Sequence, residues 1–330
     1  MKKKVFSQIK EILRDAKKGK MFILVDDGDR ENEGDLVIPG SKCNSKNINF
    51  MAKHGRGLIC LALTSKKVKK LNLPLMSSIN KSRTQTAFTI SIESKTGVTT
   101  GISAHDRAKT IKVAIKPKSN RRNIVSPGHV FPLVAKDGGV LERAGHTEAS
   151  VDISKLAKLN PSAVICEVMN EDGTMARYKD LIVFAKKHRL KIAKIEDLIS
   201  YRLRNEKLIK LISNKKIKIK KFGNFDLKVF KNRLDGSEHF AITKGRFNKS
   251  KASRVRVIST NVLNSFFNFN KDIYKNSLKH LNKFNNFALI LVKGKNLNLS
   301  SSESNKILRY YGIGAQIIKE LKIKKMILVS

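Results

Sequence analysis

The sequence predicts a mixed α/β fold arranged in two domains. The chain has 330 residues, which leaves room for roughly two domains of about 150 residues each. Over its first part, helical patterns alternate with short apolar runs of strand type, and this alternation is typical of a layered α/β or α+β domain. After residue 205 acidic residues become rare and lysine alternates with isoleucine. We therefore expect one domain over residues 1–205 and a second over residues 206–330.

The first domain contains three candidate helices. Apolar residues recur at helical spacing over Val5–Ala16, so the basic N-terminus is interpreted as an amphipathic helix and not as a signal peptide. A second helix is predicted over Ala104–Ala114, where Ser103 is a suitable N-cap and Asp106 lies near the positive end of the helix dipole. The third is predicted over Leu181–Lys187.

Short apolar runs bounded by polar residues predict the strands. The candidate strands of the first domain are Met21–Val25, Gly57–Ala62, Phe88–Ile92 and Val164–Val168, and a further apolar run begins at Leu36. In the second domain, the segment "NKKIKIKKFGNFDLKVF" alternates lysine with isoleucine, as exposed strands do.

The chain is strongly basic, with a formal net charge of +41 from 68 basic and 27 acidic residues. Such an excess can indicate a nucleic-acid partner. Here it extends along the whole chain, accompanies no RNA- or DNA-binding motif, and occurs together with abundant asparagine and isoleucine, which favours a drift toward AT-rich codons. We therefore expect no nucleic-acid partner, although the charge would attract phosphorylated substrates.

The cysteine count and the hydropathy pattern bear on the location of the protein. Cys43, Cys60 and Cys166 have no metal-type spacing and are too few for a disulfide framework, so we expect a cytoplasmic protein. The longest apolar runs are too short to span a membrane, so no membrane association is expected.

The segment "DDGDRENEGD", residues 26–35, places six acidic residues between two apolar runs. A solvated acidic turn is one interpretation, but loops between strands also carry functional side chains. The residues singled out are Arg30, Glu31, Glu33 and Asp35. Carboxylate oxygens suit Mg²⁺, and an arginine beside them suits a phosphate or carboxylate while reducing their mutual repulsion.

Two further segments contain histidines. In "SPGHVFPL", His129 follows the turn dipeptide Pro127-Gly128, so we expect it on a loop. In "RAGHTEA", Arg143, His146 and Thr147 lie close together at a candidate helix start. Arginine and threonine there could hold a phosphate against backbone N–H groups, and His146 could bind a metal or move a proton.

Glu167 lies within the apolar run "VICEVM" and faces opposite to Cys166 and Val168 on strand periodicity. A carboxylate at the end of a buried strand tends toward a raised pKa, which suits a general acid or base. Each of these features also has a purely structural interpretation. Together the segments provide candidate metal ligands, an arginine for a phosphate, and acid–base groups. This combination predicts an enzyme that acts on a phosphosugar.

The same segments closely resemble 3,4-dihydroxy-2-butanone 4-phosphate synthase. The resemblance covers roughly residues 5–205 in the order of that family. It rests on "DDGDRENEGDLVIPG", "HGRGLICLAL", "TAFTISIE", "TGISAHDRAKTI", "PGHVFPLVAKDGGVLERAGHTEASVDI" and "VICEVMNEDGTMAR". It implies an α/β sandwich that works as a homodimer with sites at the subunit interface. It also implies a lyase of riboflavin biosynthesis that converts D-ribulose 5-phosphate to L-3,4-dihydroxy-2-butanone 4-phosphate and formate with Mg²⁺ or Mn²⁺.

The resemblance implies roles for the residues that match the motifs of the family. Glu31 and His146 match the metal ligands, and His129 and Glu167 match two positions regarded as essential to catalysis. Arg30 and Asp35 match sugar contacts, and the segment from Arg143 to Thr147 matches phosphate binding. The substrate-binding set is Arg30, Glu31, Asp35, Arg143, Ala144, Gly145, His146, Thr147 and Glu167. Supporting roles fall to Glu33 in the acidic loop and to Cys60 in the pocket, and Gly28 departs from the family, which often has an acid there.

The second domain more faintly resembles GTP cyclohydrolase II, an α+β domain, through "HFAITKG", "SRVRVIST" and "RYYGIGAQIIKELKIKKMILVS". That family holds a zinc ion with three cysteines after the "VRV" strand. This chain has no cysteine beyond Cys166 and reads "NVLNSFFNFNKD" at that place, and the second domain offers only His239 and His280, which lie in the wrong places. We expect a degenerate domain without zinc, inactive on GTP, that serves stability, dimer contacts or docking.

Two alternatives remain open. One is a non-catalytic or RNA-associated protein whose charge is functional, although intact "RENEGD" and "RAGHTEA" segments argue against it. The other keeps both activities, with metal-free GTP chemistry in the second domain.

Overall fold

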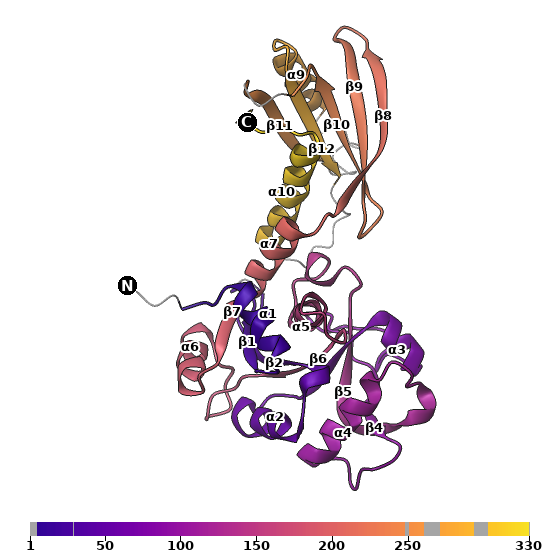
Figure 1. The fold of residues 1–330 in the computed structure, drawn as a ribbon, viewed down its shortest axis with the longest axis vertical. Coiled ribbons are helices and arrows are strands. Elements are labelled where there is room, and N and C mark those ends of the chain that lie inside the picture. The colour runs from indigo at the N-terminus through magenta and orange to yellow at the C-terminus, as the bar shows by residue number, and fades with distance from the viewer. Residues whose placement is uncertain (1–4, 29, 248–250, 261–270, 294–302, 330) are drawn as a thin grey trace. The chain divides into compact units, whose positions relative to one another are not determined.

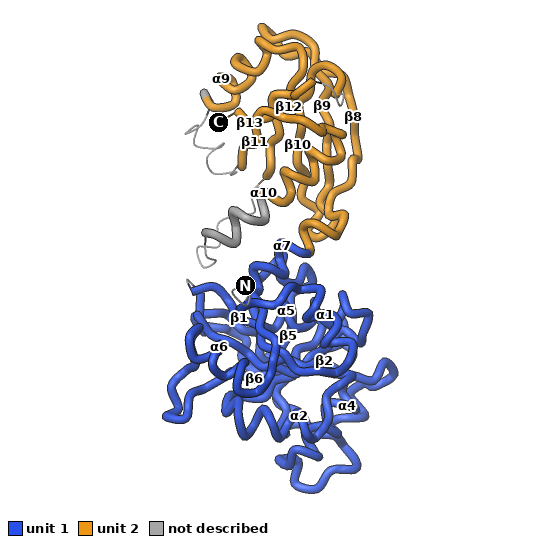
Figure 2. The backbone as a smooth tube through the Cα atoms, turned by 60° about the vertical axis from the view of Figure 1, so that its left-hand side comes forward, with its two compact units in different colours: residues 1–201 blue, residues 202–330 orange. Residues whose placement is uncertain are grey.

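The computed structural model describes residues 5–28, 30–247, 251–260, 271–293 and 303–329. The chain forms two compact units, residues 1–201 and residues 202–330 (Figure 2). No helix within the described ranges is long and apolar enough to cross a lipid bilayer.

The first unit is built on a seven-stranded sheet in the order β4-β5-β3-β6-β2-β1-β7. Its strands are β1 (Phe22–Val25), β2 (Gly34–Pro39), β3 (Cys60–Thr64), β4 (Ile92–Ser94), β5 (Ile124–Ala135), β6 (Ser162–Glu167) and β7 (Lys191–Lys194). The pairs β1–β7 and β3–β5 are parallel and the other pairs are antiparallel. The sheet is therefore mixed.

Helices cover both faces of this sheet (Figure 1). They are α1 (Ile9–Lys17), α2 (Ser45–Phe50), α3 (Ser65–Leu71), α4 (Ala104–Ile115), α5 (His146–Leu156) and α6 (Tyr178–Lys187), and α7 (Ile195–Asn205) follows β7 across the boundary of the unit at residue 201. On one face, Leu61, Leu63 and Val164 pack with α2, α4 and α6 in the main core. On the other face, Ala62 and Ala135 pack against Val151 of α5. This arrangement confirms the predicted α/β sandwich.

Most predicted elements of the first unit are present with shifted ends, but the strand expected at Phe88–Ile92 is not formed: Phe88 and Thr89 make only isolated bridges, and strand β4 begins at Ile92. Ser103 caps α4 as expected, because its side chain accepts a hydrogen bond from the Asp106 backbone N–H. The strand expected at Gly57–Ala62 begins only at Cys60. The residues before it do not pair as a strand, and the Leu58 N–H donates instead to the Glu167 carboxylate at 2.9 Å.

His129 lies in strand β5, so the expectation of a loop was wrong. Val130 pairs with Ile92 of β4, and Gly128 allows this approach because a Cβ there would clash with the Ile92 carbonyl. The strand therefore continues through the Pro127-Gly128 dipeptide, although the β4–β5 register skips residues 126–129.

The second unit contains a six-stranded sheet in the order β13-β11-β12-β10-β9-β8. Its strands are β8 (Ile209–Ile219), β9 (Gly223–Asn232), β10 (Glu238–Lys244), β11 (Ser253–Thr260), β12 (Phe287–Lys293) and β13 (Met326–Leu328). The lysine-rich segment forms the antiparallel β8–β9 pair. Helices α9 (Lys271–Leu281) and α10 (Glu303–Glu320) contribute to two separate cores, through Leu281 and Ile317 respectively. The unit has the expected mixed α+β composition.

Candidate active site

The register of the first sheet places several polar side chains on one face. Asp35 lies directly opposite Glu167 on neighbouring strands. Cys60 lies opposite both Ile165 and Phe131. Side chains two residues apart on a strand point the same way, so Glu167 and His129 share the face of Cys60. That face is the one covered by α5.

Asp26 organises the acidic loop that joins β1 to β2. Its carboxylate accepts hydrogen bonds from the Glu33 N–H at 2.9 Å and the Glu31 N–H at 3.2 Å, and from Arg30 Nη1 at 2.7 Å. Asp26 is 7% exposed. Asp26 belongs to the acidic segment described above but was not among the predicted site residues. The available signal was its position as the first acid after a buried strand.

Two arginines hold the loop. Arg30 Nη1 lies 2.6 Å from Glu31 Oε2 as well as near Asp26, and although burial opposes its charge, these two carboxylates raise the pKa of Arg30. Arg177 Nη1 donates to the Glu31 carbonyl at 2.5 Å and to Glu33 Oε1 at 3.3 Å. Arg177 lies far along the chain and was not predicted. Side-chain hydrogen bonds from Arg30 and Arg177 therefore hold the described residues of the loop.

His146 begins helix α5 and closes the cluster. Its Nδ1 lies 3.8 Å from Glu31 Oε2 and 3.9 Å from Asp35 Oδ1. Burial lowers the pKa of His146, which favours the neutral imidazole. Its Nε2 is buried and has no hydrogen-bond partner within the described chain.

Asp26, Glu31 and His146 could together hold a metal ion. One ligand atom from each lies within 4.8 Å of the others. Two carboxylates and an imidazole form a donor set that suits a divalent cation, and His146 Nδ1 is the ring nitrogen that lies near Glu31. The structure thus brings the predicted Glu31 and His146 together and adds Asp26.

The predicted phosphate segment lies at the start of α5. Arg143 Nη1 donates to Glu148 Oε2 at 2.7 Å, and its Nη2 donates to the Thr84 carbonyl at 3.0 Å. Gly145 is the N-cap, and a Cβ there would meet the Arg143 guanidinium. Ala144 is half-buried and Thr147 is buried. The segment therefore combines an arginine with the free N–H groups of a helix start.

Asp35, which is buried, and Glu167, which is half-buried, form a pair of facing carboxylates. Burial raises the pKa of Glu167, as predicted, while the hydrogen bond from the Leu58 N–H opposes that rise. Burial, followed by the charges of Glu167 and Glu31, raises the pKa of Asp35 well above its usual value. A Cβ at Gly57 would lie 2.7 Å from Glu167 Oε2, so glycine makes room for this carboxylate. Burial also raises the pKa of Cys60, which stays a thiol.

The substitution Asp35→Asn is expected to stabilise the metal-free protein at pH 8. A carboxyl whose pKa is raised on folding binds its proton more tightly in the folded state, so its contribution is lost as pH rises from about 3.9 through the raised value. A gain of about 1 kcal/mol would raise Tm by roughly 2–4 °C. Calorimetry in EDTA at pH 5 and pH 8 checks this, and an equal gain at both pH values would contradict it.

His129 is paired with a carboxylate that the sequence did not indicate. Its Nδ1 lies 2.8 Å from Glu93 Oε2 of β4. The His129 side chain is 42% exposed, whereas that of Glu93 is 11% exposed. Among the described residues, no hydrogen bond or ion pair links His129 to the acidic loop.

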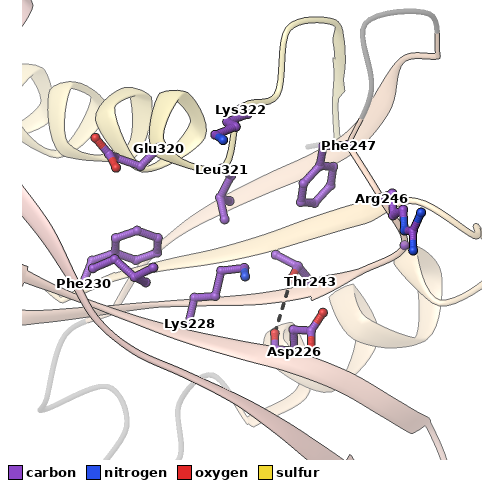
Figure 3. A pocket seen from close by; sticks show the side chains of 11 residues that line it. Asp226, Lys228, Phe230, Thr243, Arg246, Phe247, Glu320, Leu321 and Lys322 are labelled. Carbon is purple, nitrogen blue, oxygen red and sulfur yellow. Dashed lines mark hydrogen bonds between the residues drawn. The ribbon is translucent and has the colours of Figure 1, made fainter.

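The second unit contains a pocket of about 440 Å³ beside β9, β10 and the end of α10 (Figure 3). Phe230, Phe247, Lys228 and Arg246 are among the lining residues, and none of the lining residues is a cysteine or histidine. His239 is buried in β10, where its Nδ1 accepts the Lys293 N–H at 3.1 Å. Most of the segment "NVLNSFFNFNKD", residues 261–270, lies outside the described residues.

The chain is similar to known proteins over nearly its whole length. A family model described as 3,4-dihydroxy-2-butanone 4-phosphate synthase matches residues 10–201, and one described as GTP cyclohydrolase II matches residues 210–284. Riboflavin biosynthesis protein RibBA of Aquifex aeolicus is 43% identical over 98% of this chain and 87% of the relative. A 3,4-dihydroxy-2-butanone 4-phosphate synthase of Photobacterium phosphoreum is 43% identical over 98% of this chain and 93% of the relative.

Solved structures agree with these matches. The crystal structure of RibBX, a two-domain 3,4-dihydroxy-2-butanone 4-phosphate synthase from A. baumannii, has a TM-score of 0.86 at 40% identity, covering 98% of this chain and 94% of that one. A synthase solved in complex with two magnesium ions has a TM-score of 0.58 at 37% identity, covering 61% of this chain and 98% of that one.

Proposed function

Because the chain belongs to the 3,4-dihydroxy-2-butanone 4-phosphate synthase family of riboflavin biosynthesis, we propose that it converts D-ribulose 5-phosphate to L-3,4-dihydroxy-2-butanone 4-phosphate and formate. The observation that carries this proposal is the cluster of Asp26, Glu31 and His146 beside the facing carboxyls of Asp35 and Glu167. A cation site next to carboxyls of raised pKa is what the chemistry of a phosphorylated enediol needs.

The cofactor in this proposal is Mg²⁺ or Mn²⁺, held by Glu31 and His146 with Asp26 as a further carboxylate. The bound cation would supply positive charge that stabilises negative charge developing on adjacent substrate oxygens. The related synthase solved with two magnesium ions supports this choice of metal.

The chain's own side chains would bind the substrate at its two ends. Arg143, Thr147 and the first N–H groups of α5 would hold the phosphate. Arg30 and Asp35 would contact hydroxyl groups at the other end, where the acidic loop is held by Arg177. Ala144 and Gly145 would let the backbone approach the substrate closely, since neither carries a bulky side chain.

Proton transfers fall to Glu167 and His129. Formation of the enediol, loss of water and the shift of the carbon skeleton each require a proton to be taken up or delivered. Burial raises the pKa of Glu167, so this carboxyl can accept and return a proton nearer to neutral pH than an exposed one. His129 would exchange protons through its exposed imidazole.

We also propose a cytoplasmic homodimer with its sites at the subunit interface. The exposure of His129, which is 42% for its side chain, supports a site that is completed by a second copy. All three cysteines are buried and unpaired, which supports a reducing compartment.

Formate release from D-ribulose 5-phosphate tests the proposed reaction. The purified full chain is expected to release formate with Mg²⁺ and to stop when EDTA removes the metal. Absence of formate from folded, metal-loaded protein would contradict the proposal and favour the non-catalytic alternative.

The second unit is proposed to be inactive on GTP and to bind no zinc. The chain has no cysteine after Cys166, and His239 is occupied by a backbone hydrogen bond within the sheet. We expect no consumption of GTP by the full chain, with or without added Zn²⁺, under conditions in which formate is released from the pentose phosphate. Consumption of GTP in EDTA would instead support the metal-free bifunctional alternative.

A further inference from the structure

The carboxylate of Glu93 is held from several sides. One oxygen, Oε2, lies 2.8 Å from His129 Nδ1, and the other, Oε1, accepts a hydrogen bond from Thr110 Oγ1 at 3.3 Å. Thr110 Oγ1 in turn accepts the Ser94 N–H at 3.0 Å. Both carboxylate oxygens therefore have partners, and those partners come from a strand and from helix α4.

The backbone around this carboxylate is shaped to accommodate it. Gly101 has a φ of +90°, and a Cβ built there would clash with the Glu93 carboxylate. The β4–β5 register shifts between Ile92, which pairs with Val130, and Glu93, which pairs with Val125, so residues 126–129 are skipped and His129 lies beside Glu93 without pairing in the ladder. Glu93 is 9% exposed, so a charged group is buried here with a histidine as its charged or polar partner.

The exposed side of the pair is the imidazole. A buried carboxylate that accepts a hydrogen bond from one ring nitrogen sets which nitrogen carries the proton and restricts rotation of the ring. The other nitrogen, Nε2, is then left for chemistry, and strand periodicity places His129 on the same face of the sheet as Glu167.

We infer that Glu93 is a positioning residue for the reaction, which holds His129 in one orientation and one tautomer through its hydrogen bond to Nδ1. This inference rests on the proposed function of His129 in proton transfer. Glu93 itself does not contact the substrate. Its effect on catalysis therefore passes entirely through His129.

A double-mutant cycle tests this dependence in the full chain. Glu93→Gln is expected to lower kcat by about 10–100-fold, as loss of an orienting partner does, with KM changed by less than about twofold. In the His129→Asn background the same substitution is expected to change kcat by less than about twofold, because residues that act as one unit are not additive.

A spectroscopic measurement reports on the contact without substrate. In protein labelled with ¹⁵N-histidine, the seven histidines give ring nitrogen signals, and those of His129 are identified by their loss in His129→Asn. Glu93→Gln is expected to shift the His129 nitrogen signals toward a mixture of tautomers. The control is Asp15→Asn, which removes a carboxylate of 13% exposure that lies 3.1 Å from Lys191 and should leave kcat and the His129 signals unchanged.

The outcomes are separable. An unchanged kcat in Glu93→Gln, an equal loss in the His129→Asn background, or unaltered His129 signals would each overturn the inference. A wild-type protein that releases no formate would overturn the proposed function as well. A wild-type synthase with a fully active Glu93→Gln variant would overturn only the role of Glu93.

Discussion

Replacing Glu31 with glutamine is expected to lower kcat by about a thousandfold, because a divalent cation contributes several kcal/mol to stabilising charge in the transition state. The substitution keeps the size of the side chain but removes the charge. The Arg30 guanidinium would lose the Glu31 carboxylate, which lies 2.6 Å from its Nη1, and would keep Asp26 as its charged partner. Its positive charge would then repel the metal ion. Mn²⁺ affinity, measured by electron paramagnetic resonance, should fall by about tenfold or more.

Glu171→Gln is the matched control for this experiment. The Glu171 side chain is 81% exposed and lies 3.6 Å from Arg56, so its loss should leave both kcat and Mn²⁺ affinity unchanged. If Glu31→Gln binds Mn²⁺ as tightly as the wild type, then Glu31 is not a ligand and the proposed metal site is wrong.

Replacing Glu167 with glutamine is expected to lower kcat by about 10²–10⁴-fold, the range for losing a general acid or base. The amide oxygen can still accept the Leu58 N–H, which donates to the carboxylate at 2.9 Å, so the local structure should persist. Mn²⁺ affinity should stay within about twofold of the wild type. The two substitutions therefore differ in one readout, since Glu31→Gln weakens the metal and Glu167→Gln does not.

Thermal unfolding tests whether Glu167→Gln loses activity only because the folded protein is less stable. Glu167→Gln also removes repulsion from Asp35, which is directly opposite on β2, so its Tm in EDTA should be equal to or above that of the wild type at pH 8. A variant that keeps most of its kcat would show that Glu167 moves no proton in the slow step.

Local patterns in the sequence were sufficient for the fold class and for several site residues. Alternating helix and strand periodicity predicted the layered α/β architecture, which the seven-stranded sheet between helices confirms. The apolar run around Glu167 predicted a raised pKa for this carboxyl, which burial in β6 confirms. Both predictions depend on stretches of a few residues, over which periodicity and burial are closely linked.

Local patterns failed at His129, where a strand continues through a turn dipeptide. The Pro127-Gly128 dipeptide predicted a loop at His129, yet β5 continues through it because Gly128 admits the backbone of β4. The neighbouring strand β4 is distant in sequence, since Glu93 lies 36 residues before His129. A turn signal alone contains no information about that strand.

The sequence by itself determined which residue types were available for chemistry: the carboxylates of the acidic loop, His146 at a helix start and Glu167 in a buried strand. The tertiary structure alone decided which of them meet. Asp26 joins Glu31 and His146, Arg177 holds the loop from 146 residues away, and Glu93 pairs with His129. The physical reason is that these contacts follow from the order and register of strands distant in sequence, whereas periodicity reports only on neighbours along the chain.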